Sequence, residues 1–413
     1  MDNIPHFERF VNTERQELTV ILCHKLGKNE LYATIVIRSA FPGTYDRCRD
    51  QTAYDPVKEA RMVRITLDRA GLALLERHAA WWAREASLIT RARGEPLGHL
   101  WLPLADGTEA VEDLDVRPEL LDVERLVGEP LTPGPLEIQG DLYRTEAPYM
   151  RVPWVEAILG TPIRATIQGG SMRTMAFVED WAAWERPSNE RDGAPSHRDE
   201  AWFDLLKRMT EMLVARSGGR YAVAQTLMRG PSDLAEAVLG PELMSFSIYD
   251  HPGSLRRFLD EVTETFVEIL RAQLERIPPV EGGYVTPFGI WAPGTVVRTQ
   301  CDASAFLSSA HYAEWFLPYD VRISEAVDYS IIHLHSCSLH TVDALLSVEH
   351  PHAIQVTLED PGPSLEEMAP IFARILEAKP LLLEGPLSEA EVGWLREQLP
   401  AGGLAITARD SEW

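Results

Sequence analysis

Tyr329-Ser330-Ile331-Ile332-His333-Leu334-His335-Ser336-Cys337-Ser338 is the stretch that decides the predicted fold. It begins with apolar, β-branched residues and then runs into polar ones. A strand that is covered on both faces is apolar until it reaches the protein surface. The stretch therefore predicts a buried strand whose end lies at a functional site. His333, His335 and Cys337 are spaced two apart and would point to the same side of an extended backbone.

Two of these side chains are candidate metal ligands. Imidazole and thiolate are ligands that Zn²⁺ prefers, so His335 and Cys337 could supply two ligands of a metal site. The alternative is that both simply line a pocket, because the neighbouring sequence offers no third ligand. His333 is an alternate ligand or a general acid or base.

The chain around this stretch alternates strands and helices with short connections. We expect helices at 201–216, 231–239, 252–276, 309–328, 341–347, 364–378 and 388–399, and strands at 221–226, 284–291, 296–300, 353–357, 380–384 and 404–407. This alternation predicts an α/β protein with a parallel sheet.

Such a repeat can close into an eight-stranded (β/α)8 TIM barrel or stay open as a doubly wound sheet. No Gly-x-Gly-x-x-Gly fingerprint marks the switch point of an open sheet, which favours the barrel. Catalysis in a barrel is expected where the carboxyl ends of the strands meet at one mouth. The polar or aromatic residues predicted there are Gln168, Gln225, Trp291, Asp302, His333, His335, Cys337, Gln355, Glu384 and Asp410.

Residues 1–150 are predicted to be an N-terminal α+β extension that packs on a barrel formed by 151–413. Runs at 18–24 and 31–38 predict a β-hairpin. A helical pattern covers 56–92, as one helix or a broken pair, and 94–150 predict irregular connections and short strands. A short strand at 163–167 follows and leads to Gln168-Gly169-Gly170-Ser171, which is more typical of a turn than of a phosphate site.

Charge and composition exclude several classes of protein. The 413 residues include 39 Lys and Arg against 63 Asp and Glu, a net charge of −24, which opposes binding to nucleic acid or to an anionic membrane. The four cysteines have no framework spacing, and the sequence begins without a signal-peptide pattern, so we expect a cytoplasmic protein. No apolar run approaches the length of a membrane span.

Four motifs in order resemble the uroporphyrinogen decarboxylase superfamily across about residues 150 to 410. They are Gly230-Pro231-Ser232-Asp233-Leu234-Ala235-Glu236-Ala237-Val238-Leu239-Gly240, Tyr249-Asp250-His251-Pro252, Asp302-Ala303-Ser304-Ala305-Phe306-Leu307-Ser308 with Phe316-Leu317-Pro318-Tyr319, and His335-Ser336-Cys337. The superfamily contains the decarboxylase of haem synthesis and the zinc-dependent methyltransferases that serve corrinoid proteins. The resemblance implies a (β/α)8 barrel.

The sequence is more similar to the methyltransferase branch. Its members hold zinc at a His-x-Cys pair, here His335 and Cys337, and at a third cysteine after the last barrel strand, where this sequence has Asp410. The Arg-Gln-Ala-Gly-Arg type motif of the decarboxylase is absent.

The resemblance implies methyl transfer as the activity. Zinc held by His335, Cys337 and a carboxylate, Asp410 or Glu384, would bind a substrate thiol, whose thiolate attacks a methyl group on the cobalt of a corrinoid. Asp302, His333 and Glu384 are the predicted catalytic residues that orient ligands or move protons. Gln168, Arg164, Gln225, Trp291, Arg298 and Gln355 are the predicted substrate-binding residues.

Two alternatives remain open. In a metal-free decarboxylase of lyase type, Asp302 would stabilise a positive pyrrole intermediate while Arg164 or Arg298 binds substrate carboxylates. In a non-catalytic barrel, the same mouth would only bind a small ligand. The expected partners are a small-molecule substrate and a corrinoid protein, and a homodimer is the default oligomer.

Overall fold

The computed structural model describes the following parts of the chain: residues 9–12, 16–22, 33–37, 65, 67–93, 102–128, 137–149, 151–168, 171–176, 181–185, 199–359 and 361–409. They belong to two compact units, Met1–Tyr54 and Asp55–Trp413. The predicted packing of residues 1–150 as an extension on 151–413 stays a prediction.

The first unit contains a three-stranded antiparallel sheet. Its strands are β1 (Arg9–Asn12), β2 (Gln16–Leu22) and β3 (Ala33–Ile37), in the order β1-β2-β3. The pairing of β2 with β3 confirms the predicted hairpin.

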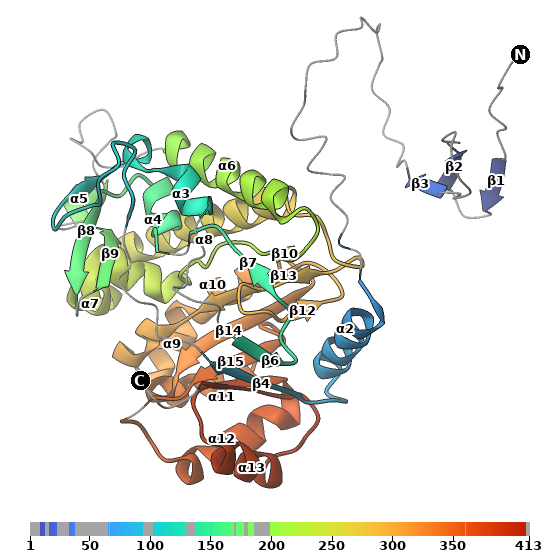
Figure 1. Cartoon of the computed structure of the whole chain (residues 1–413). Coiled ribbons are helices and arrows are strands. Elements are labelled where there is room, and N and C mark those ends of the chain that lie inside the picture. Colours follow the sequence, from blue (N-terminus) through green and yellow to red (C-terminus); the bar gives the residue numbers. More distant parts are fainter. Residues whose placement is uncertain are drawn as a thin grey trace, which may run out of the picture. The chain divides into compact units, whose positions relative to one another are not determined.

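A sheet with six parallel strands is the centre of the second unit (Figure 1). In sheet order these strands are β13 (Val296–Gln300), β14 (Tyr329–His335), β15 (Ala353–Thr357), β16 (Leu381–Pro386), β17 (Leu404–Arg409) and β4 (Leu88–Arg93). A seventh strand, β6 (Glu137–Gly140), pairs antiparallel with β4. The predicted α/β class is confirmed, whereas closure into an eight-stranded barrel stays a prediction.

Helices connect the parallel strands, as the alternation predicted. They are α9 (Ser309–Trp315), α10 (Leu317–Ser324), α11 (Val342–Leu346), α12 (Leu365–Ala378) and α13 (Glu389–Gln398). The predicted helix at 309–328 is two helices: Phe316 lies between them, and Pro318 is in the first turn of the second one. Ser364 and Ser388 close capping boxes that begin α12 and α13.

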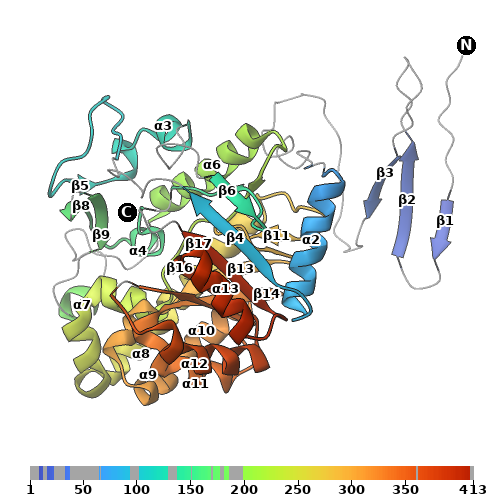
Figure 2. The same cartoon turned by 60° about the horizontal axis from the view of Figure 1, so that its bottom comes forward.

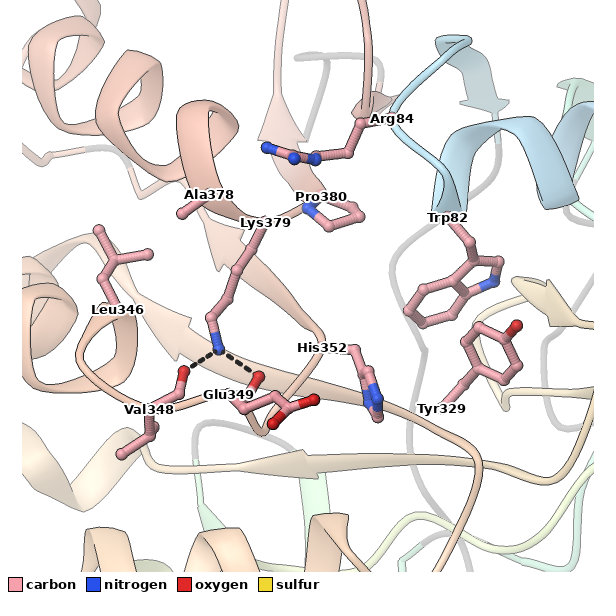
Figure 3. Close-up of a pocket in the computed structure, with 10 residues that line it drawn as sticks. All are labelled: Trp82, Arg84, Tyr329, Leu346, Val348, Glu349, His352, Ala378, Lys379 and Pro380. Carbon is pink, nitrogen blue, oxygen red and sulfur yellow. Dashed lines mark hydrogen bonds between the residues drawn. The ribbon is translucent and has the colours of Figure 1, made fainter.

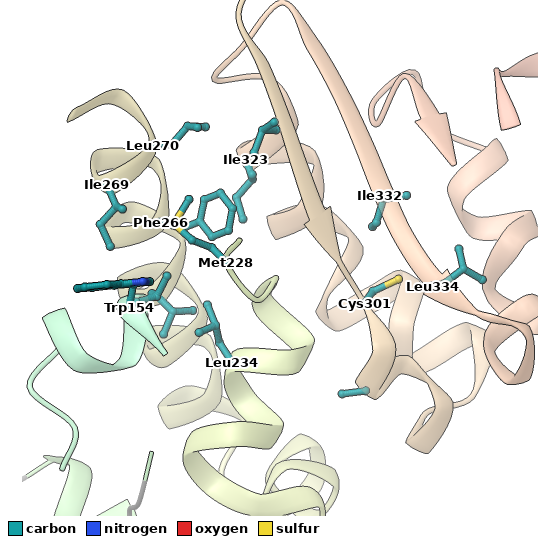
Figure 4. Close-up of a cluster of buried hydrophobic side chains, with 14 of the residues drawn as sticks. Trp154, Met228, Leu234, Phe266, Ile269, Leu270, Cys301, Ile323, Ile332 and Leu334 are labelled. Atoms are coloured by element: carbon teal, nitrogen blue, oxygen red, sulfur yellow. The ribbon is translucent and has the colours of Figure 1, made fainter. Parts of the chain in front are cut away.

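Three long helices form a second group: α6 (Glu200–Ser217), α7 (Pro231–Asp250) and α8 (Pro252–Leu274). α7 is interrupted at Gly240, whose φ of 77° no β-branched residue would adopt readily. α8 buries Phe266, Ile269 and Leu270, and Figure 4 shows Phe266 near Ile323 of α10 and Met228. Burial of this apolar face holds α8 against the neighbouring helices α7 and α10.

Short elements complete the second unit. They are α2 (Arg69–Trp82), β5 (Asp115–Val116), α3 (Val123–Gly128), β7 (Thr145–Glu146), α4 (Trp154–Ile158), β8 (Ile163–Gln168), β9 (Ser171–Ala176), α5 (Trp181–Glu185), β10 (Ala222–Val223), β11 (Tyr284–Val285) and β12 (Trp291–Ala292), with 3-10 turns η1 (Pro118–Leu120), η3 (Asp302–Phe306) and η4 (Ser336–Thr341).

Three sequence predictions are corrected here. The predicted helical pattern at 56–92 overlaps the strand β4 from residue 88 onward, and β4 lies between β6 and β17 (Figure 2). The predicted strand at 163–167 exists as β8 but pairs with β5 and β9 in a separate antiparallel sheet. The predicted strand at 284–291 is instead the short antiparallel pair β11 and β12.

Residues on the parallel strands alternate between the two faces of the sheet. One face, with Ile332, Leu334, Val356 and Leu383, joins the large core shared with the helices. The opposite face has an apolar layer that includes Leu88, Ile331, Ala353, Leu382 and Ala405. Two residues further along each of β14, β15 and β16, this face carries His333, Gln355 and Glu384, so polar side chains gather at the carboxyl end of the sheet.

Among the described residues, none of the helices combines the length and the apolar character that crossing a membrane would require.

A candidate metal site at the carboxyl end of the parallel sheet

Three neighbouring strands place polar side chains on one face. The cross-strand partner of Gln300 is His333, and that of His333 is Gln355. Hydrogen bonds between side chains show that the row is continuous, since Arg298 Nε donates to Gln355 Oε1 (3.0 Å) and Gln355 Nε2 donates to Glu384 Oε2 (2.6 Å).

Asp302, His333 and His335 form the candidate metal site. The two histidines lie on β14, and Asp302 begins η3 directly after β13 and Cys301. Asp302 Oδ1 is 3.3 Å from His333 Nε2, and Asp302 Oδ2 is 3.7 Å from His335 Nε2. One ligand atom from each residue can be chosen so that all three lie within 4.8 Å of one another. Two imidazoles and a carboxylate are a donor set that suits zinc and other divalent transition metals.

Glu359 fixes the orientation of His335. Its Oε1 lies 2.9 Å from Nδ1 of His335, and its Oε2 accepts a hydrogen bond from the hydroxyl of Ser336 at 2.9 Å. A carboxylate on one ring nitrogen leaves the other nitrogen to face Asp302, as in the carboxylate–histidine pairs of metal sites.

Gln300 holds Asp302 from the other side. Its Nε2 donates to Asp302 Oδ2 (3.2 Å) and to Asp233 Oδ2 (2.8 Å). Asp233 also accepts from the backbone N–H of Ala303. Burial raises the pKa of Asp233 to about 7, and the negative charge of Asp302 contributes to the same shift.

The two histidines have different electrostatic surroundings. Burial lowers the pKa of His333 well below its usual value, and the charge of Arg298 lowers it further. The pKa of His335 is raised, chiefly by the nearby carboxylate of Asp302, against the opposing effect of burial. A neutral His333 offers a lone pair to a metal, whereas His335 would release its proton when a metal binds.

The structure brings six predicted site residues together: Asp302, His333, His335, Arg298, Gln355 and Glu384. It also adds Gln300, Glu359, Asp233 and Arg409, which the sequence analysis missed; Arg409 pairs with Glu384. Gln300 could have been found, because it lies two residues before Asp302 and on the same face as Arg298.

Other predicted residues lie elsewhere. Cys337 is exposed on η4 and outside the three-residue cluster. Trp291 is buried against α2, where its backbone N–H donates to Nδ1 of His78. Gln225 donates to the carbonyl of Val296 at the start of β13, away from the carboxyl end. Arg164 is exposed on β8.

Two predictions fall outside what the structure describes. They are Asp410, as a metal ligand, and the side chain of Gln168, as a substrate contact.

A hollow of about 360 Å³ lies at the opposite end of the strands (Figure 3). Residues at strand beginnings line it, including Tyr329, His352 and Pro380. Nζ of Lys379 donates to the carbonyls of Val348, Glu349 and Pro351. Because backbone carbonyls accept from this amine at three positions, Lys379 stabilises the loop at the amino end of the sheet, and the hollow has a structural role.

Comparisons with known proteins found similarity among solved structures. No family model matches the chain, and no curated protein matches it. Among solved structures, a methyltransferase from Methanosarcina mazei is similar with a TM-score of 0.47 and 14% identity, over 82% of this chain and 93% of that chain.

Proposed function

We propose that this chain is a metal-dependent enzyme in which Asp302, His333 and His335 hold one divalent metal ion. The observation that carries the proposal is the convergence of their ligand atoms within 4.8 Å, at the carboxyl end of a parallel sheet. Of the ligands predicted from sequence, the proposed set keeps His335 and replaces Cys337 and Asp410. A metal ion bound there would lower the pKa of a substrate thiol and so favour its thiolate.

The reaction that we propose is methyl transfer from a corrinoid carrier to a small thiol. The order of motifs that resemble the corrinoid methyltransferases supports this choice. The chain's own groups would prepare the site: Glu359 fixes the ring of His335, and Gln300 holds the carboxylate of Asp302. Burial keeps His333 neutral, so its lone pair stays available.

Metal content tests the first part. The protein should be made without a histidine tag, loaded with zinc, dialysed and measured by elemental analysis. We expect about one zinc per chain, and its loss in His333→Ala and Asp302→Ala. His251→Ala, which removes an exposed histidine between α7 and α8, is the matched control and should retain zinc. Equal zinc in wild type and in both site variants would contradict the proposed ligands.

Turnover tests the second part. Methylcobalamin and a small thiol are incubated with zinc-loaded protein, and loss of the methylcobalamin absorbance is followed. We expect transfer only with metal present and not in His333→Ala. Full transfer by metal-free protein would remove the mechanism, and metal binding without transfer to any thiol would leave a metal enzyme of another reaction class.

A further inference from the structure

Arg298 is a buried arginine whose hydrogen-bond acceptors are amides and not carboxylates. It lies on β13 and is 5% exposed. Its Nη1 donates to Gln300 Oε1 (2.6 Å), and its Nε donates to Gln355 Oε1 (3.0 Å). The centre of the Phe288 ring lies 4.6 Å from the guanidinium carbon. Two amides and one aromatic ring therefore hold the guanidinium in place.

Arg298 determines which way both amides point. A guanidinium has donors and no acceptor, so only the oxygen of an amide can face it. The NH2 group of each glutamine must then point away from Arg298, toward a carboxylate. Gln300 Nε2 donates to Asp302 Oδ2 at 3.2 Å. Gln355 Nε2 donates to Glu384 Oε2 at 2.6 Å. Because an ionised carboxylate has acceptors only, each amide is matched at both of its ends.

The amide of Gln300 also separates Arg298 from a proposed metal ligand. Burial lowers the pKa of Arg298, and the charge of Asp302 opposes this effect more strongly than any other group does. Within the residues that the structure describes, however, no carboxylate forms an ion pair with Arg298. Gln300 lies between the two charges, since it accepts from Arg298 and donates to Asp302. Without this amide, a buried guanidinium would lose an acceptor and be attracted to the carboxylate.

Asp302 can serve a metal ion only while its oxygens are not taken by an arginine. Its Oδ1 accepts no hydrogen bond from a described residue, so these lone pairs are open to a metal ion or to a guanidinium. We propose that Arg298 and Gln300 are a positioning pair: Arg298 fixes the amide of Gln300, and this amide keeps Arg298 away from Asp302. Arg298 therefore supports metal binding when Gln300 is present and opposes it when Gln300 is absent. The role requires no contact between Arg298 and a substrate. It rests on the proposed function, because it takes Asp302 as a metal ligand.

A double-mutant cycle on zinc affinity tests the pair, with the full-length chain and competition by a chromophoric chelator. Arg298→Met alone should weaken zinc binding roughly 3- to 10-fold, because the amide of Gln300 loses the donor that fixes it. Arg298→Lys can still donate to Gln300 and should weaken binding less. Gln300→Leu, which fills a similar volume without an amide, should weaken it roughly 10- to 100-fold. Adding Arg298→Met to Gln300→Leu should then strengthen zinc binding roughly 10-fold relative to Gln300→Leu.

The change of sign separates this role from a merely structural one, which would weaken zinc binding in both backgrounds. Arg409→Met in the Gln300→Leu background is the matched control, since Arg409 is paired with Glu384, and it should restore nothing.

Loss of zinc affinity through Arg298→Met in both backgrounds, or in neither, would overturn the proposal. The cycle is repeated with Gln300→Ala, so the result does not depend on the folding of one variant. Equal losses in Arg298→Lys and Arg298→Met would also overturn it, and this comparison needs no change at Gln300. Wild-type protein that binds no zinc would instead refute the metal site itself, so the two failures are distinguishable.

Discussion

Replacement of Glu359 is the sharpest probe of the metal site, because this residue touches a proposed ligand without being one. Its carboxylate lies 2.9 Å from Nδ1 of His335. In Glu359→Gln an oxygen can still accept from Nδ1, so only the charge is lost. A charge-assisted hydrogen bond exceeds a neutral one by about 1 kcal/mol, and the half-exposed position of Glu359 reduces this through solvent screening. Zinc affinity should therefore fall roughly three- to fivefold.

Glu359→Ala removes the hydrogen bond entirely and frees the ring of His335. Its affinity should fall further, by roughly 10- to 100-fold, which is typical for loss of an outer partner of a metal ligand. Competition with a chromophoric chelator measures both constants. Glu366→Gln, an exposed glutamate in the first turn of α12, is the control and should bind zinc as wild type does. Wild-type affinity in Glu359→Ala, or weaker binding in the glutamine variant than in the alanine variant, would refute the role of Glu359.

Three further predictions concern the scaffold. Lys379→Met removes three hydrogen bonds to backbone carbonyls and should lower the free energy of unfolding by about 2–4 kcal/mol; urea unfolding that differs by less than about 0.5 kcal/mol would contradict the tie. Burial raises the pKa of Asp320 well above 3.8, so its carboxyl stabilises the fold fully below that value and loses this contribution as pH rises through the raised pKa. Asp320→Asn should therefore show a smaller difference in unfolding free energy between pH 5 and pH 8 than wild type, and an equal difference would count against it. In Gly230→Ala, the new Cβ would collide with the backbone oxygen of Gln300 and lie 2.7 Å from Thr299 Oγ1, so we expect a loss of about 1–3 kcal/mol together with weaker zinc binding; unchanged zinc affinity would show that Gln300 does not position Asp302.

Most of the parallel strands could be predicted from local sequence. Ala353–Thr357 was predicted with its observed bounds, because a short apolar run between turn signals leaves few alternatives. The helical pattern predicted over 56–92 is wrong at its end, where β4 (Leu88–Arg93) begins. The chain turns at Arg84, whose φ of 59° is uncommon for a residue other than glycine. β4 forms a strand because it pairs with Ala405 and Ile406 of β17, more than three hundred residues away. No local pattern reveals such a pairing.

In the candidate site, too, local sequence predicted some residues and could not predict others. His333, His335 and Asp302 were found because each lies at the end of a predicted strand. The prediction that Cys337 joins them requires the backbone to stay extended beyond His335. β14 ends at His335, and η4 begins at Ser336, so the alternation of faces no longer holds at Cys337. Glu359 was missed because it follows β15 in a loop, where periodicity gives no signal.

The two possible metal ligand sets can be separated at Cys337. If His333, His335 and Asp302 are the ligands, Cys337→Ala should keep about the zinc content and affinity of wild type, because the exposed thiol contributes no bond. In addition, zinc should not protect Cys337 from iodoacetamide, since a thiol that is not bound to metal remains reactive when the site is filled. Alkylation can be mapped by mass spectrometry with and without zinc, with the buried Cys301 as an internal reference for unreactive thiol. Zinc-dependent protection of Cys337, together with loss of zinc in Cys337→Ala, would restore the His335 and Cys337 pair predicted from sequence and would require the chain to rearrange around η4 when metal binds.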